Sequence, residues 1–159
     1  MALSAEGKRV FMRLCVIALG IPTALLAFCA VLRFSPWAVE RTEATAGTLN
    51  LAAGCLAAGG LSAWAFFSLY LYRRLWKLFP YIGDREKGWS YAEGVFGLTG
   101  VGTSMSSVLG LFYYLFSGDF GRAALLFAIS YALAALEAGR FPSRIDDVED
   151  ALADKQAEK

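Results

Sequence analysis

Histidine is absent from this sequence of 159 residues. Its absence removes the commonest metal ligand, the usual haem ligand and the usual proton carrier at neutral pH. Only three cysteines are present, Cys15, Cys29 and Cys55, and no two of them form a C-x-x-C pair. A zinc or iron–sulfur pattern is therefore missing as well. The sequence predicts no metal site and no cofactor.

Ionisable residues are also missing from the centres of the long apolar runs. Such residues are the usual mark of proton relays and ion-coupled transport in membranes. Without histidine, a serine or cysteine nucleophile would need a lysine or a carboxylate as its base, and no apolar run offers that combination. The net charge of +1 gives no electrostatic basis for binding nucleic acid. We therefore expect neither catalysis, nor proton-driven transport by this chain alone, nor a nucleic-acid partner.

The sequence does contain long runs of apolar residues. Hydrophobic residues make up 57% of the chain and the mean hydropathy is +0.49, whereas soluble domains are about 45–50% apolar. The excess falls in four runs, each close to the roughly 20 residues that a spanning helix needs. These runs cover about residues 14–32, 46–72, 94–116 and 120–137. The sequence predicts an all-α integral membrane protein whose residues 1–141 form four transmembrane helices. Pro22 is expected to kink the first helix, and Pro80 to end the second.

Lysine and arginine are unevenly divided among the segments that flank these runs. Twelve lie in the N-terminal segment, in residues 73–87 and after residue 139, whereas the other two connections hold three, Arg33, Arg41 and Arg122. Cationic residues collect on the cytoplasmic side of membrane proteins. We therefore predict that both chain ends lie inside, in a bacterial inner membrane or an organellar inner membrane.

Small side chains recur every four residues along the predicted helices. In lipid, helices associate through such residues and through side-chain hydrogen bonds. The third run carries Gly102, Ser106 and Gly110, beside a hydroxyl row of Thr99, Thr103 and Ser107, and the second run carries Gly54, Ala58 and Ser62. These rows predict either packing among the four helices of one monomer or contact with another protein, above all through the third run.

The segment 142–159 follows the last run and is acidic. Ile145, Val148 and Leu152 repeat at helical spacing, while the other face carries carboxylates. This pattern predicts a short amphipathic cytoplasmic helix that begins after Pro142. Its apolar face is expected to dock on a partner protein, or the tail to fold back on its own chain. The basic residues that it would meet there, or that would otherwise face lipid head groups, are Arg73, Arg74 and Lys77.

A few polar residues lie at or near the predicted helix ends. Glu93 follows Ser90 by three residues, which is the spacing of a capping box. Glu137 is expected to pair with Arg140 on the next turn. Asn50 is the one strongly polar side chain well inside a run, and we expect it to form a hydrogen bond between helices.

The combination of small-residue faces with missing reactive groups favours a non-catalytic membrane subunit, scaffold or assembly factor. Its expected partners are membrane lipids and other membrane protein subunits or further copies of itself. One alternative is a small homo-oligomeric channel or transporter for ions or neutral solutes, with the stripe of residues 99–110 facing the pathway. Another is a lipid- or quinone-binding membrane protein with a pocket at the Pro22 kink.

Overall fold

The structure is a computed structural model that describes residues 4–78 and 84–157, and these residues are helical with short connections. The predicted stop at Pro80 lies outside the described residues. Four helical rods are long and apolar enough to cross a membrane, and no strand occurs in the described ranges. The prediction of an all-helical protein with four helices of spanning length and composition is therefore confirmed. The elements are α1 (Ala5–Phe34), α2 (Ala46–Ala65), the π-helical turn η1 (Phe66–Tyr70), α3 (Leu71–Leu78), α4 (Arg85–Ser117) and α5 (Phe120–Ala157).

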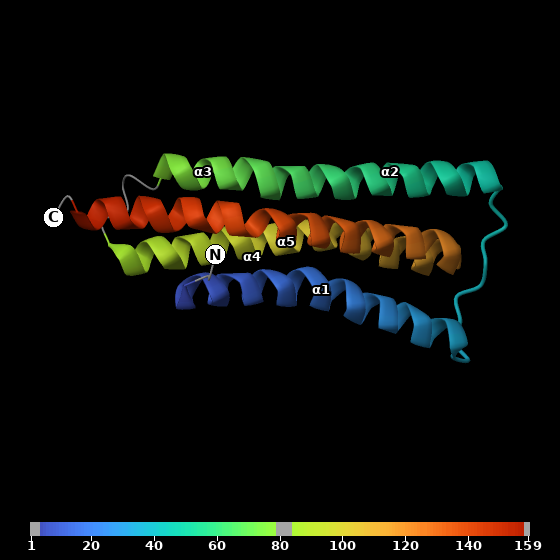
Figure 1. Cartoon of the computed structure of the whole chain (residues 1–159). Coiled ribbons are helices and arrows are strands. Elements are labelled where there is room, and N and C mark those ends of the chain that lie inside the picture. The colour runs from blue at the N-terminus through green and yellow to red at the C-terminus, as the bar shows by residue number, and fades with distance from the viewer. Residues whose placement is uncertain (1–3, 79–83, 158–159) are drawn as a thin grey trace.

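The helices run alternately up and down, with α2, η1 and α3 forming one continuous rod (Figure 1). The α4 and α5 helices form the centre, while α1 packs on one side of them and the α2–α3 rod on the other. The starts of α1 and α4 and the ends of α3 and α5 therefore share one end of the bundle, which we call the terminal end. Short connections favour this antiparallel arrangement of neighbours.

Polar caps set where three of the helices begin. Ser4 caps α1 by accepting from the Gly7 backbone N–H at 3.0 Å, and Thr45 caps α2 in the same way. Asp84 caps α4 and accepts from Glu86 N at 3.3 Å. The predicted capping box at Ser90 and Glu93 is therefore wrong, because both residues lie inside α4.

The last helix is longer than the sequence pattern predicts. The fourth run was expected to end near residue 137 and a separate helix to begin after Pro142, but α5 continues without a break to Ala157. The Ser143 hydroxyl donates to Arg140 O at 3.0 Å inside this helix. Pro22 likewise lies within an uninterrupted α1, which curves along its second half (Figure 1).

The α4 helix is the packing centre of the bundle. In its most apolar stretch 61% of residues are buried, against 11% in the α2–α3 rod. Small residues make this possible, since a side chain at Gly100 would meet Ile17 of α1, one at Gly102 would meet Phe67 of η1 and one at Gly110 would meet Leu126 of α5. The small side chains of α4 are thus used within the monomer.

The apolar face of the C-terminal segment belongs to the core. Ile145, Val148 and Leu152 are at most 3% exposed and pack in one cluster with residues of α1, α3 and α4, among them Leu14 and Leu75. Of the two expected positions for the tail, the structure therefore has it against its own chain. The face that was expected to be free for a partner is covered.

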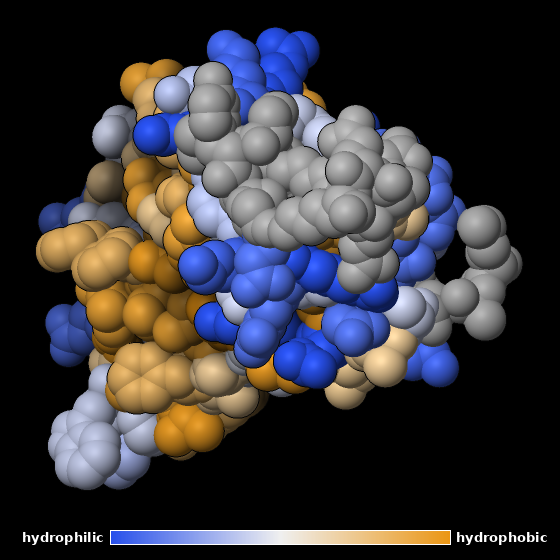
Figure 2. Space-filling view, turned by 90° about the vertical axis from the view of Figure 1, so that its left-hand side faces the viewer, coloured by the Kyte–Doolittle hydropathy of each residue, from blue (hydrophilic) through white to orange (hydrophobic). Residues whose placement is uncertain are grey.

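Charged residues gather at the terminal end. Figure 2 looks onto this end and shows hydrophilic side chains grouped there, while a hydrophobic flank begins on the left of the view. Large apolar side chains are exposed along the rods, including Val31, Leu51 and Phe112. A flank of this kind fits a lipid environment, since soluble proteins rarely expose large continuous apolar patches.

The turn between α4 and α5 depends on a glycine. Gly118 has φ +67°, and a Cβ there would lie 2.5 Å from Glu40 O. We expect Gly118→Ala to destabilise the protein by at least about 1–2 kcal/mol, because both the left-handed backbone and the lack of space oppose a side chain. Thermal unfolding in detergent measures this. Gly94→Ala, where no atom lies within 4 Å, is the control and should not lower the melting temperature.

Asp119 of the same turn makes the stability of the protein depend on pH. Burial alone would raise its pKa, but hydrogen bonds from Arg122 and the charge of that side chain outweigh burial and hold the pKa of Asp119 below its ordinary value of 3.8. A lowered folded-state pKa adds stability above the unfolded value, and this stability is lost as the pH falls through the folded value. We expect Asp119→Asn to lower the melting temperature at pH 7. The variant should also lose less stability than the wild type as the pH falls below about 4. Equal pH profiles for variant and wild type would contradict this.

Candidate functional site: a buried carboxylate between α2 and α5

Glu137 is the only charged residue in the described ranges that is buried, with 2% exposure. It lies in the middle of α5 and faces the α2–α3 rod. A buried carboxylate is unfavourable unless its oxygens are paired and accept hydrogen bonds. Its partners therefore define a site.

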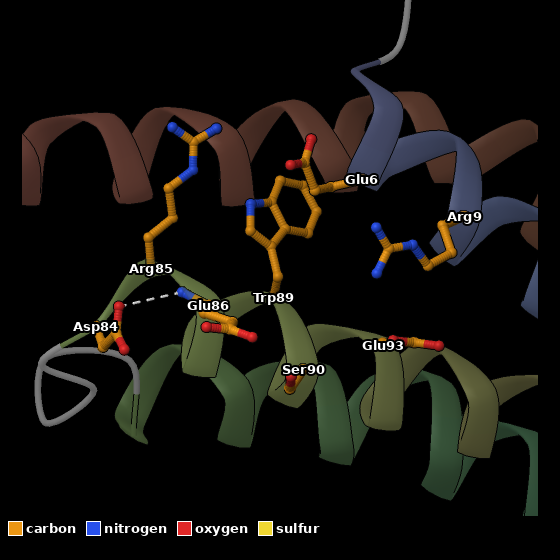
Figure 3. A pocket seen from close by; sticks show the side chains of 8 residues that line it. All are labelled: Glu6, Arg9, Asp84, Arg85, Glu86, Trp89, Ser90 and Glu93. Carbon is orange, nitrogen blue, oxygen red and sulfur yellow. Dashed lines mark hydrogen bonds between the residues drawn. The ribbon is translucent and has the colours of Figure 1, made fainter.

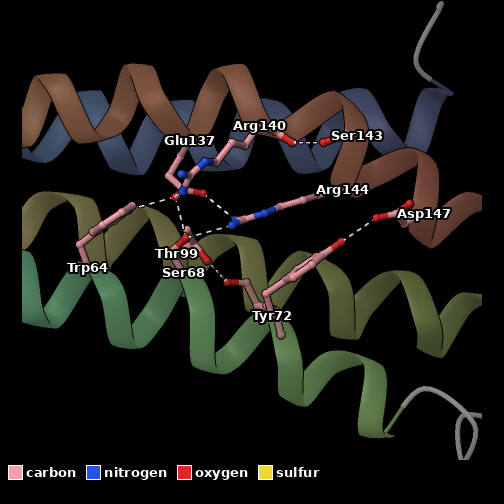
Figure 4. Close-up of polar contacts among 10 residues, drawn as sticks. Trp64, Ser68, Tyr72, Thr99, Glu137, Arg140, Ser143, Arg144 and Asp147 are labelled. Carbon is pink, nitrogen blue, oxygen red and sulfur yellow. Dashed lines mark hydrogen bonds and ion pairs between the residues drawn. The ribbon is translucent and has the colours of Figure 1, made fainter.

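Three donors satisfy the Glu137 carboxylate (Figure 4). Trp64 Nε1 donates to Oε1 at 3.0 Å, Ser68 Oγ donates to Oε1 at 2.6 Å, and Arg144 Nη1 donates to Oε2 at 2.7 Å. The Arg140 guanidinium is more distant, with Nη1 at 3.8 Å from Oε1. Two helices that are far apart in the sequence thus meet at one carboxylate.

Ser68 is brought to the carboxylate by the π-helical turn η1. A π-helical turn is rare, and such turns are frequently found at functional sites. Phe67 of this turn approaches α4 at Gly102, where a Cβ would lie only 2.7 Å from Phe67 Cβ. The same turn stacks the rings of Phe66 and Tyr70 with centroids 5.0 Å apart. The glycine on α4 therefore makes room for the turn that carries Ser68.

The network continues from Glu137 towards the terminal end. Arg144 Nη2 donates to Ser68 Oγ at 3.2 Å, and the Arg144 guanidinium carbon lies 4.7 Å from the centre of the Tyr72 ring. Tyr72 Oη then donates to Asp147 Oδ2 at 3.1 Å. We call the set Trp64, Ser68, Tyr72, Glu137, Arg144 and Asp147 the carboxylate network. It fastens α5 to the α2–α3 rod over several turns.

The chemistry of the carboxylate network is that of a fixed ion pair. Arg144 has only 11% of its side chain exposed, so both charges are largely removed from solvent. Each Glu137 oxygen already accepts from at least one donor. No group of three or more acidic or cysteine side chains suited to a metal ion occurs in the described part of the chain. The arrangement holds two helices together.

Sequence reasoning identified one partner of Glu137 and missed the closer ones. The predicted pairing with Arg140 is present at 3.8 Å, but Arg144, seven residues on, is nearer. Two turns of helix return to the same face, so this spacing was a signal, and it was lost because a helix break was expected at Pro142. Nothing in the sequence pointed to Trp64 or Ser68.

The predicted row of α2 faces away from the bundle. Gly54, Ala58 and Ser62 are exposed, and a side chain at Gly54 would meet nothing within 4 Å. The helix packs instead through Gly60, where a Cβ would lie 2.0 Å from Ser106 Oγ and 2.9 Å from Ser106 Cα. The row of the second run is therefore not used inside the monomer.

The hydroxyl row of α4 is turned into its own helix. The side chains of Thr99, Thr103 and Ser107 are buried and donate to the carbonyl oxygens of Val95, Gly100 and Ser104 at 2.6 to 3.0 Å. Such bonds within one helix are common for serine and threonine. Ser106 Oγ is also buried, and it has no hydrogen-bond partner.

The remaining predicted positions lie at the two ends of the second rod. Arg73, Arg74 and Lys77 are exposed on α3, and no ion pair joins them to the acidic residues of the described part of α5. Asn50 Oδ1, at the other end, accepts from Arg122 Nε at 2.8 Å. The expected hydrogen bond between helices is therefore present, from α2 to α5.

Comparison of the chain with protein-family models, with curated proteins and with solved structures found no match. The function is therefore inferred from the residues themselves. Two observations carry it: the carboxylate network, which fixes the rods together, and the small-residue row that α2 leaves uncovered.

Proposed function

We propose that this protein crosses a bacterial or organellar inner membrane four times, with both ends inside. Four long apolar rods, charged residues grouped at the terminal end and an apolar flank support this placement. At about 1.5 Å per residue, Glu137 lies roughly 26 Å along α5 from Phe120, close to the inner limit of a hydrocarbon core about 30 Å thick. The rest of α5 would then project into the inner compartment.

Within that membrane, the proposed role is that of a non-catalytic subunit, scaffold or assembly factor. The observation that carries this proposal is the uncovered row Gly54, Ala58 and Ser62. Small side chains let another helix approach closely, which is the main source of helix association in lipid. The corresponding row on α4 is already covered, so α2 is the face that would meet a second protein or a second copy of this chain.

Filling the row tests this role. We expect Gly54→Leu together with Ala58→Leu to abolish association, because two large side chains would hold an approaching helix away. Purification in mild detergent followed by native mass spectrometry measures the bound partner or second copy. Gly20→Leu is the matched control, since Gly20 is exposed on α1 and has no neighbour within 4 Å. A wild-type protein that is strictly monomeric, or equal association in all variants, would contradict the proposal.

The alternative role as a channel receives less support. The α4 hydroxyls that would face a pathway are buried and bonded to their own backbone. We therefore expect liposomes containing the protein to show no flux of ions or neutral solutes above that of empty vesicles. Flux that is reduced by Thr103→Val would favour the channel role instead.

Lipid binding is a second candidate, favoured by one crevice. A cavity of about 480 Å³ opens between α2 and α4 and is walled mainly by apolar side chains, including Leu56, Phe112 and Phe116. The hydroxyls of Tyr113 and Ser117 at its edge already donate to backbone carbonyls. The crevice therefore suits an acyl chain better than a quinone, whose carbonyls need donors. Native mass spectrometry would distinguish retained phospholipid from retained quinone.

A further inference from the structure

A polar pocket of about 410 Å³ lies at the terminal end, between the start of α1 and the start of α4. Figure 3 shows its side chains converging from both helices around Trp89. This pocket is separate from the carboxylate network, which lies on the other rods. Its volume exceeds that of a single ion and matches a small organic group.

Trp89 indicates that the pocket takes a ligand. Its side chain is 8% exposed, and its Nε1 atom is buried without a hydrogen-bond partner. In Figure 3 the indole stands within the pocket, with its nitrogen on the side towards Arg85. A buried N–H without an acceptor is unfavourable, and buried indole nitrogens usually find one. An oxygen atom of a bound group would supply it.

The charges around Trp89 are of both signs. Glu6 and Arg9 reach the pocket from α1, and Glu86 reaches it from α4. None of these three side chains has a hydrogen bond or ion pair within the described part of the chain. Glu93, by contrast, is paired with Arg13 at 2.6 Å. The pocket thus offers two unpaired carboxylates, one unpaired guanidinium and one N–H, and Asp84 and Arg85 add one further charge of each sign to its lining.

This set fits a zwitterion better than an ion of one sign. A lone anion would be repelled by the carboxylates, and the described residues contain no group suited to a metal ion. We propose that the pocket binds a phosphoethanolamine group, with phosphate oxygens accepting from Trp89 Nε1 and Arg9 and with the ammonium near Glu6 and Glu86. A primary ammonium donates N–H bonds to carboxylates, whereas a quaternary ammonium cannot and is instead held by several aromatic rings. Trp89 is the one aromatic side chain lining the pocket in the described ranges.

The same group occurs on a phospholipid and as a free molecule. The proposal favours the phospholipid and rests on the proposed membrane placement, because Trp89 lies one helical turn beyond the Arg13–Glu93 pair, where head groups would be. Tryptophan is also enriched at this level of membrane proteins. Free O-phosphoethanolamine provides the arm that does not depend on a membrane.

The experiment titrates the full-length protein in detergent with short-chain phosphatidylethanolamine, phosphatidylcholine and phosphatidylglycerol of one chain length, and with O-phosphoethanolamine. Isothermal calorimetry measures each affinity. We expect phosphatidylethanolamine to bind at least about tenfold more tightly than the other two lipids, as expected for one lost charge-assisted bond. Glu6→Gln should remove this preference, whereas Trp89→Phe and Arg9→Ala should weaken the binding of all three lipids, because each lipid carries the phosphate; melting temperatures show that the variants are folded. Trp37→Phe is the matched control, since Trp37 is 81% exposed beyond the far end of α1.

Each outcome decides the proposal. Binding of phosphatidylethanolamine that depends on Trp89 and Glu6 supports it, and weak or absent binding of the free compound then assigns the lipid as the source. Equal binding of all three lipids, a preference that survives Glu6→Gln, or affinities that Trp89→Phe leaves unchanged would overturn it. Because association through α2 is measured separately with Gly54→Leu and Ala58→Leu, failure of the pocket and failure of the proposed subunit role give different results.

Discussion

Glu137→Ala is expected to cost about 3–5 kcal/mol of stability, the range seen when one member of a buried ion pair is removed. The substitution takes the acceptor from Trp64, Ser68 and Arg144 together. Arg144 would be left largely buried, with the Ser68 hydroxyl as its remaining close hydrogen-bond acceptor. Reversible unfolding in mixed micelles, followed by circular dichroism, measures the change.

The double variant Glu137→Leu with Arg144→Met is the informative companion. It removes both charges and restores apolar volume, so it should be more stable than Glu137→Ala alone, since a buried pair can often be replaced by apolar residues at little cost. Trp64 and Ser68 would still lose their acceptor, and we therefore expect the double variant to remain below the wild type. A double variant that is as unstable as the single one would show that Arg144 is not the partner that matters.

Gly60→Ala is the second substitution expected to reduce stability strongly, because the added methyl group would force α2 and α4 apart. The new Cβ would lie 2.9 Å from Ser106 Cα and still closer to its side chain. Removing the hydroxyl cannot relieve the contact with the Cα atom, so a backbone must move. Overpacking of this kind costs about 1–3 kcal/mol.

Gly54→Ala in the same helix is the matched control. It has no neighbour within 4 Å, and an exposed alanine is favoured over glycine in a helix by up to about 1 kcal/mol. We expect the melting temperature to fall for Gly60→Ala and to stay or rise for Gly54→Ala. The reverse order would mean that α2 packs through its Gly54, Ala58 and Ser62 row instead.

The sequence was sufficient to predict those helices whose formation and packing depend on local composition. Four runs of apolar residues predicted four rods, and the small residues of the third run predicted close packing along that helix, either within the monomer or with another protein. Gly102 and Gly110 carry that prediction, because their missing side chains leave room for Phe67 and Leu126. Close approach in a bundle requires small residues wherever it occurs, so the signal is local.

The face of α2 could not be predicted in the same way. Spacing at every fourth residue marked Gly54, Ala58 and Ser62, but Gly60, which is outside that row, contacts α4. A row of small residues indicates that another helix can approach closely, but it does not indicate which helix does so. The rotation of α2 about its axis is fixed by distant contacts, among them Ser68 with Glu137, 69 residues apart.

Glu137 itself was placed at a helix end, where a carboxylate is ordinary. The structure has it in mid-helix and buried, because α5 continues past Pro142 and brings Arg144 to the same face. A proline in a helical sequence usually marks a helix boundary. A helix break was therefore expected at Pro142, and the pairing of Glu137 with Arg144 was missed. The interior of the bundle therefore contains one charged carboxylate, which is compensated by Arg144.

The most direct test of the central claim, four spans with both ends inside, is the accessibility of single cysteines. Cys15, Cys29 and Cys55 are first replaced, and Lys87→Cys, Asp150→Cys and Glu43→Cys are introduced one at a time at exposed positions. A membrane-impermeant maleimide is applied to intact cells expressing the protein in their inner membrane, with the outer barrier opened. We predict that Glu43→Cys is labelled at once, whereas Lys87→Cys and Asp150→Cys are labelled only after the inner membrane is permeabilised. Labelling of Lys87→Cys or Asp150→Cys from outside, or equal labelling of all three, would contradict the account.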